Sequence, residues 1–197
     1  MIRIFHTADW HLGQTFFGYD RKLEHQHFLG WLKKNLSERE IDVLLISGDV
    51  FDVSNPSASA QRMFYEFLGD VVKDNPLLQI VVISGNHDSA SRLEVPQPLL
   101  DKNRVVIKGL IPKKEGLVDY DSLIIDLKNK AGEVEVLCLA VPFLRQGDYP
   151  SVPGVENTYS AGVQAFYAEM IEVAKKRKEK NQALIIMGHL HTLKAEV

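Results

Sequence analysis

Four short apolar runs in this sequence each end in residues that can bind a metal ion, and this repeated pattern restricts the fold more than any other feature. The four segments are IFHTADWH (4–11), LLISGDVFD (44–52), VVISGNHD (81–88) and LIIMGHLH (184–191). A short run of β-branched and aliphatic residues is typical of a buried strand. Because ligands bind at the carboxyl ends of strands in α/β sheets, we expect the four segments to bring their polar residues to one rim.

The rest of the chain predicts an α/β domain. Strands are expected at 2–5, 43–47, 78–84, 104–107, 122–126, 134–141 and 183–187, and helices at 23–36, 60–72 and 163–174. This order favours a first sheet built by β-α-β units and a second, partly antiparallel sheet formed by the later strands. The length of 197 residues and the absence of a linker indicate one domain over 1–197.

Composition excludes some classes of protein and leaves others open. The formal net charge of −3 gives no overall basic field, so a nucleic-acid partner has to be argued from a site. The single cysteine, Cys138, cannot form an intrachain disulfide, which favours a reducing, cytoplasmic compartment. No apolar run reaches the roughly 18 residues of a membrane span. We therefore expect no membrane partner.

The polar residues after the four runs form a mixed ligand set of carboxylates, imidazoles and an amide. Such a set suits Mn, Fe or Zn, whereas Mg and Ca favour sites made of oxygen alone. Two metal ions held about 3.5–4 Å apart neutralise the charge of a phosphate ester and lower the pKa of a shared water toward ~7. The chemistry predicted for the rim is therefore phosphoester hydrolysis.

Each ligand can be given a place in such a centre. Two neighbouring cations repel one another and require a bridging carboxylate, for which we predict Asp49. We predict that Asp9 and His11 bind one metal ion and that Asn86 and His189 bind the other.

Two further residues are predicted to act on the substrate. His87 directly follows a ligand, so we expect its imidazole to point at the substrate and to steady the phosphate or protonate the leaving oxygen. A histidine in this role requires an acceptor that orients its ring, and Asp52 is available three residues after Asp49. The histidines His6, His25 and His27 lack such a context and are interpreted as structural or surface residues.

These motifs resemble the calcineurin-like metallophosphoesterase superfamily, whose pattern runs D-x-H, G-D-x-x-D, G-N-H-D/E, G-H and G-H-x-H. The segments HTADWHLGQ, RKLEHQHFLGWL, SGDVFDVSNPS, SGNHDSASRLE and VPFLRQGD are similar, more narrowly, to the SbcD exonuclease family. This resemblance implies a sandwich of two β-sheets flanked by helices. It also implies two Mn ions, cleavage of DNA ends and hairpins in double-strand-break repair, and an SbcC-type coiled-coil ATPase as partner. A homodimer through helices near 57–72 and 89–101 is implied as well.

The last motif departs from the family pattern. The chain stops six residues after His191, whereas SbcD-like chains have a first Gly-His here and a separate Gly-His-x-His further on. We therefore interpret His189 as the earlier ligand and leave open whether His191 is a ligand or incidental. The expectation that follows is a nuclease domain incomplete at its C-terminus, with metal occupancy and activity in doubt.

Two other functions fit the same residues. A phosphodiesterase or phosphatase acting on a small molecule or a phosphoprotein needs the same ligand set, and the acidic pI favours it slightly. A non-catalytic scaffold of the same fold is the third reading. It needs none of the predicted ligands, so their presence counts against it.

Overall fold

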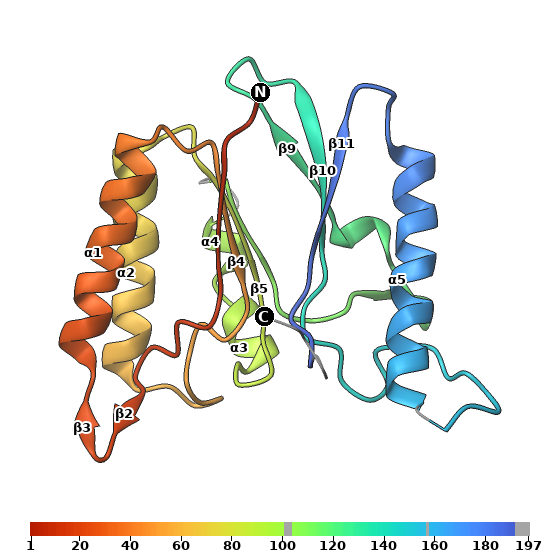
Figure 1. Ribbon diagram of the computed structural model, residues 1–197, viewed down its shortest axis with the longest axis horizontal. Coiled ribbons are helices and arrows are strands. Elements are labelled where there is room, and N and C mark those ends of the chain that lie inside the picture. Colours follow the sequence, from red (N-terminus) through yellow and green to blue (C-terminus); the bar gives the residue numbers. More distant parts are fainter. Residues whose placement is uncertain (101–103, 157, 192–197) are drawn as a thin grey trace, which may run out of the picture.

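The computed structural model describes residues 1–100, 104–156 and 158–191, and it shows two sheets stacked face to face with helices on both outer sides (Figure 1). The first sheet is parallel throughout, and its strand order is β1 (Ile4–Thr7), β4 (Val43–Ser47), β5 (Gln79–Ile83) and β6 (Val105–Lys108). In the second sheet, β10 (Val134–Ala140) pairs in parallel with β11 (Ala183–Met187) and antiparallel with β9 (Ile124–Lys128). The expected α/β sandwich, with a partly antiparallel second sheet, is confirmed.

Three long helices cover the outer faces of the sheets. The helices α1 (Lys22–Glu38) and α2 (Ala58–Asp74) lie on the first sheet, and α5 (Thr158–Arg177) lies on the second (Figure 1). The shorter elements are α3 (Ala90–Glu94), α4 (Gln97–Leu100), a 3-10 helix (Asp121–Leu123), and two hairpins, β2–β3 (Thr15–Phe16 and Tyr19–Asp20) and β7–β8 (Lys113–Lys114 and Leu117–Val118). No described helix is long and apolar enough to cross a membrane.

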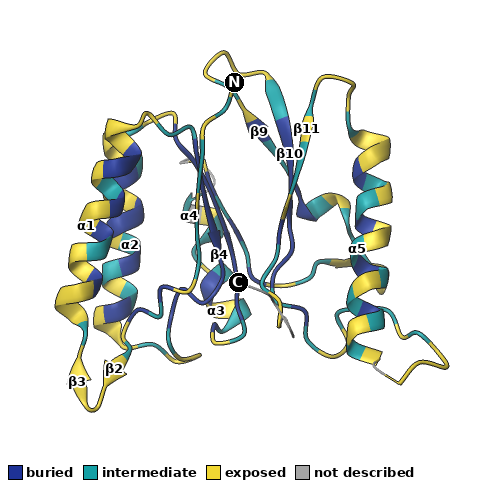
Figure 2. Ribbon diagram, in the orientation of Figure 1, coloured by how far each residue is buried: buried dark blue, intermediate teal, exposed yellow. Residues whose placement is uncertain are grey.

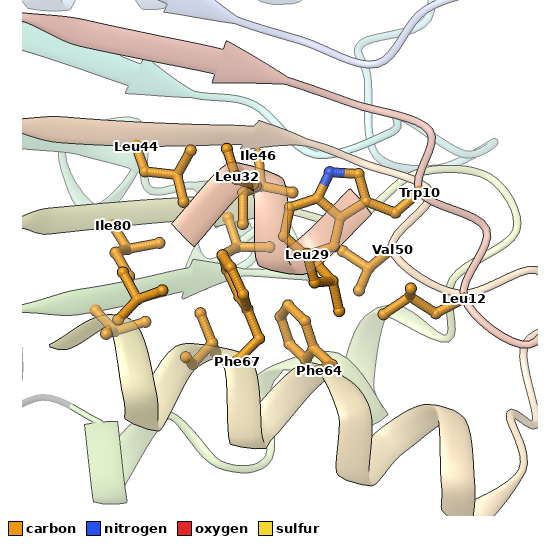
Figure 3. Close-up of a cluster of buried hydrophobic side chains, with 14 of the residues drawn as sticks. Trp10, Leu12, Leu29, Leu32, Leu44, Ile46, Val50, Phe64, Phe67 and Ile80 are labelled. Carbon is orange, nitrogen blue, oxygen red and sulfur yellow. The ribbon is translucent and has the colours of Figure 1, made fainter. Parts of the chain in front are cut away.

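The alternation of side chains along β4 explains why the molecule forms layers. Leu44 and Ile46 point to the cluster under α1 and α2 (Figure 3), whereas Val43 and Leu45 point to the cluster between the two sheets. Successive residues of a strand face opposite sides, so a strand that is apolar at every position must be covered on both faces. Figure 2 shows the result, with the central strands β4 and β5 of the first sheet buried and the helices buried on one side only.

A third cluster joins the second sheet to α5. Phe166 and Met170 of α5 are fully buried with Leu137 and Leu139 of β10, while Cys138, between those two leucines, belongs to the cluster between the sheets. Each sheet is thus packed on both faces, against a helix layer on one side and the other sheet on the other.

Candidate metal centre

The four segments predicted to converge do converge, at the carboxyl ends of β1, β4, β5 and β11. The two histidines from the first and last segments lie on either side of Asp49. The Oδ2 atom of Asp49 is 3.6 Å from His11 Nε2 and 3.5 Å from His189 Nε2. Asp9 Oδ1 lies 3.9 Å from His11 Nε2. Three of these strands are neighbours in the parallel first sheet and β11 belongs to the second sheet, so both sheets contribute to the predicted rim.

Asp49 occupies the middle of this group. Its side chain is buried, and its two oxygens have different surroundings. Oδ1 accepts a hydrogen bond from the main-chain N–H of His87 at 3.0 Å, which leaves Oδ2 facing both histidines. A carboxylate with one oxygen fixed and the other placed between two imidazoles has the geometry that a bridging ligand requires.

The main chain is in an unusual conformation at three of the predicted ligands. Asp9, His11 and Asp49 have φ angles of +56°, +46° and +48°, in the left-handed region that residues other than glycine seldom adopt. Two main-chain hydrogen bonds hold the first two loops together, from Asp9 N to Gly48 O at 3.1 Å and from His11 N to Asp49 O at 3.0 Å. Unfavourable main-chain conformations of this kind cluster at functional sites.

The hydrogen bonds of His189 provide a test of whether the site suits a cation. Its Nδ1–H donates to the carbonyl oxygen of Ser47 at 2.9 Å, so Nε2 of the neutral ring carries a lone pair. With the Asn86 amide oriented as in the structure, this Nε2 faces Asn86 Oδ1 at 3.0 Å and Asp49 Oδ2 at 3.5 Å. Nε2 and these two oxygens then face one another with lone pairs and no hydrogen between them. A bound cation, or a proton on Nε2, would remove the resulting repulsion.

His11 is oriented in a similar way by Asp52. The Nδ1 atom of His11 is buried and makes no well-aligned hydrogen bond among the described residues, but Asp52 Oδ1 lies 3.2 Å from it. A carboxylate beside one nitrogen of a histidine keeps the proton there and leaves the other nitrogen free for a metal ion. The free nitrogen is Nε2, which faces Asp9 and Asp49.

The contact of His87 differs in one atom from the prediction. Its Nδ1 donates to the main-chain oxygen of Asp52 at 2.7 Å, whereas the Asp52 carboxylate lies against His11. The prediction placed the carboxylate beside His87, because a sequence identifies side chains and does not indicate which main-chain atoms make contacts. The hydrogen bond to the Asp52 carbonyl raises the pKa of the His87 imidazole above its ordinary value, and burial opposes this effect. The ring of His87 packs edge-on against His11, with 4.8 Å between centroids.

Asp88 has a structural role that sequence reasoning missed. Its carboxylate is buried and accepts three main-chain hydrogen bonds, from Gly85 at 2.9 Å, Phe51 at 2.9 Å and Val50 at 3.2 Å. Burial raises the pKa of Asp88, while these three donors act in the opposite direction. Asp88 therefore joins the loop after β4 to the loop after β5. The sequence feature that could have indicated this role is the position of Asp88, an acid that follows shortly after the end of a buried strand.

Glycines precede three of the predicted ligand loops for a steric reason. A Cβ atom on Gly85 would overlap the carboxylate and main-chain nitrogen of Asp49, and one on Gly188 would overlap the Tyr167 hydroxyl. Gly48 has a φ of +88°, which favours glycine directly. At Gly48 and Gly85 the two loops approach one another so closely that only glycine fits, whereas at Gly188 the obstacle is the end of a side chain on α5.

The ligand atoms in the centre are 3.0 to 3.9 Å apart, equal to or slightly longer than the separations expected around a divalent ion. Two ligand atoms that are each about 2.1 Å from one ion lie roughly 3.0–3.5 Å apart. Among the described residues, two groups bring their ligand atoms within 4.8 Å of one another, namely His11, Asp49 and His87, and Asp9, Asp49 and His189. Asp49 is common to both groups. They place Asp9 with His189 and His11 with His87, whereas the prediction placed Asp9 with His11 and assigned His87 to the substrate. The residues present therefore fit a divalent metal centre.

His191 lies beside this centre. It is exposed, its ring packs edge-on against Phe143 with 5.1 Å between centroids, and it belongs to neither group. The final residues, 192–197, lie outside the described part of the chain, so the predicted domain boundary at 197 stays a prediction.

Comparison with known proteins gives one consistent result. Residues 2–195 match the family model described as calcineurin-like phosphoesterase, a family that uses divalent metals. The chain is 43% identical over 194 residues to the SbcD subunit of nuclease SbcCD from Rhodobacter capsulatus, covering 96% of this chain and 48% of that protein. The protein of the same name from Escherichia coli K12 is 29% identical over 208 residues, covering 98% and 48%. The chain spans about half the length of these curated relatives.

Proposed function

The chain belongs to the calcineurin-like phosphoesterase family, and we propose that it provides the phosphodiester-cleaving centre of a Mn-dependent DNA nuclease subunit of SbcD type. The observation that carries the proposal is the position of Asp49, with Oδ2 between His11 and His189 at nearly equal distances. A non-catalytic scaffold gains nothing from holding three ligand residues in left-handed main-chain conformations.

The proposed ligands divide around Asp49. Asp9 and His11 would hold one metal ion, Asn86 and His189 would hold the other, and Asp49 would be the ligand that both ions share. Bound divalent ions would neutralise the phosphate charge and provide a nucleophilic water at neutral pH. The chain itself supplies the orientation of each ligand, through Ser47 at His189 and the Asp52 carboxylate at His11.

We assign His87 to the substrate. Its ring is exposed enough to meet a phosphate, and the Asp52 carbonyl keeps the proton on Nδ1, so that Nε2 is the nitrogen available to the substrate. In the imidazolium form, Nε2–H can donate to a phosphoryl oxygen or pass its proton to the leaving oxygen. Asp52 therefore serves two residues, His87 through its carbonyl and His11 through its carboxylate.

The proposed partners follow from the family resemblance and from the names of the relatives. The substrates would be DNA ends and hairpins in double-strand-break repair, and the protein partner would be an SbcC-type coiled-coil ATPase. A homodimer would form through α2 and the α3–α4 segment. The predicted ranges 57–72 and 89–101 are helical in the structure except at residues 57, 89, 95 and 96, and residue 101 lies outside the described residues.

The full-length protein tests this proposal with Mn²⁺ and two substrates, linear duplex DNA and a chromogenic phosphodiester. Both are expected to be cleaved, and Asp49→Asn is expected to lower both rates by more than roughly 100-fold, because a direct ligand matters at least as much as the residues that orient it. Asp126→Asn is the matched control, since Asp126 lies on β9 in an ion pair with Arg177.

The alternative substrate class would give a different result. Hydrolysis of the chromogenic ester without any cleavage of DNA, even with the ATPase partner present, would contradict the nuclease proposal. That outcome would favour the phosphodiesterase acting on a small molecule or phosphoprotein, which the net charge of −3 suits better.

A further inference from the structure

A polar cavity of about 570 Å³ opens directly beside the candidate metal centre, and the roles assigned above do not use it. Asn86, a proposed metal ligand, forms part of its wall, so the cavity borders the centre. The rest of the wall comes from the loops after β4, β5, β6 and β10. The polar and aromatic residues that matter here are Ser54, Ser89, Ser91, Phe143, Arg145 and Gln146.

The cation of this cavity, Arg145, is held in a fixed orientation. Its Nη2 donates to the carbonyl oxygens of Gly85 at 3.3 Å and Asp88 at 3.1 Å, the residues on either side of Asn86 and His87. Its guanidinium carbon lies 5.5 Å from the centroid of the Phe143 ring, within the range of a cation–π contact. Arg145 is therefore tied to the same loop that carries the predicted catalytic histidine.

The charge of Arg145 is not neutralised by the acids around it. Asp148 also lines the cavity, but its Oδ2 accepts from the main-chain N–H of Arg145 at 2.8 Å, and no ion pair joins its carboxylate to the guanidinium in the described structure. The Asp88 carboxylate is occupied by three main-chain N–H groups. Among the described residues, Nε and Nη1 of Arg145 make no hydrogen bond. They remain free to donate to a ligand.

We propose that this cavity binds the phosphate group next to the one that is cut, so that the site recognises a chain of nucleotides. The inference rests on the proposed function. Arginine presents its N–H groups in a planar fork that matches two phosphate oxygens, and the three serine hydroxyls can donate as well. Because Arg145 already covers Phe143, the ring offers less room for stacking a base. Contacts to phosphate carry no sequence information, which suits a nuclease without base preference.

The first test changes the charge of the cavity without touching Arg145 or the metal centre. Gln146 is exposed and lines the cavity, so Gln146→Glu adds a negative charge there and Gln146→Lys a positive one. With the full-length protein and Mn²⁺, we expect Gln146→Glu to lower kcat/KM for a trinucleotide about 3–10-fold, the size of one partly screened charge interaction. We expect Gln146→Lys to raise it or leave it equal. Both variants should change hydrolysis of a chromogenic phosphodiester less than they change hydrolysis of the trinucleotide, because the ester has no second phosphate.

Two controls make the result specific. Gln182→Glu makes the same chemical change next to the start of β11, at the end of that strand opposite the metal centre, and should change neither rate. Binding is measured separately, as fluorescence anisotropy of a labelled single-stranded oligonucleotide with EDTA present. Gln146→Glu should weaken this binding by a similar factor.

The outcomes separate the two proposals. If DNA is cleaved but Gln146→Glu changes the trinucleotide and the chromogenic ester equally, or changes neither, the phosphate site is wrong and the nuclease proposal stands. If the ester is hydrolysed and no DNA substrate is cleaved, the nuclease proposal and the phosphate site fall together.

Discussion

The position of the Asp49 carboxylate depends on Gly85, a residue that has no side chain with which to bind a metal ion. Asp49 Oδ1 packs against Gly85, where any side chain would overlap the carboxylate and the main-chain nitrogen of Asp49. The carboxylate cannot move away freely, because Oδ1 is also bonded to the His87 N–H. A single added methyl group at Gly85 should therefore be felt at the metal centre.

We predict that Gly85→Ala weakens Mn²⁺ binding more than 10-fold and lowers the free energy of unfolding by about 1–3 kcal/mol, since overpacking forces main-chain shifts. Calorimetric titration with Mn²⁺ and urea denaturation measure the two effects. Gly30→Ala is the control, because Gly30 is exposed on α1 and a Cβ there meets nothing within 4 Å. This variant should gain about 0.5–1 kcal/mol from improved helix propensity. Unchanged metal binding in Gly85→Ala would contradict the packing argument.

At the residue scale, the sequence predicted which loops meet but not which atoms make the contacts. The pattern of apolar runs ending in ligand residues is enough to place Asp9, Asp49 and His189 at one rim. It does not show that Asp52 uses its carbonyl toward His87, or that Asp88 bonds to Val50, 38 residues away. Contacts made by main-chain atoms leave no signal in the identity of a side chain.

At the scale of elements, strands that are apolar at nearly every position were the easiest to predict. The expected strand at 43–47 is β4 without any shift, and the one at 183–187 is β11. The expected strand at 122–126 begins with a 3-10 helix and becomes β9 only at Ile124. The two short hairpins were missed because two-residue strands with exposed side chains have no hydrophobic period to detect.

The helix α5 should contribute much of the stability of the second sheet. Phe166 on this helix is fully buried, so Phe166→Ala is predicted to lower the free energy of unfolding by about 3–5 kcal/mol. Phe17→Ala makes the same change at a side chain that is 86% exposed, and it should stay within about 0.5 kcal/mol of the parent. Urea denaturation followed by circular dichroism compares the two variants. Similar losses in both would mean that α5 does not pack on the sheet as described.

For the whole molecule, the cluster between the two sheets decides whether the layers stay together. Cys138 is buried in this cluster, and burial raises the pKa of its thiol to about 12. At pH 8 roughly one thiol in 10,000 is then ionised, and thiol reagents attack only the ionised form.

We therefore predict that the native protein does not react with a colorimetric thiol reagent at pH 8, and that one thiol per chain reacts at once in guanidinium chloride. The rate of thiol labelling should rise with urea concentration in parallel with the loss of the circular dichroism signal. Rapid labelling while the secondary structure is intact would show that the two sheets separate in the native state.

The whole fold serves to bring the ends of β1, β4, β5 and β11 to one rim, which we interpret as a divalent metal centre that depends on Asp49. Calorimetric titration of this chain with Mn²⁺ is the decisive test, in which the parent is compared with Asp49→Asn and with the control Asp126→Asn. We expect the parent and Asp126→Asn to bind Mn²⁺ alike and Asp49→Asn to lose more than roughly 100-fold in affinity. Equal binding by all three proteins would show that the rim is not such a centre.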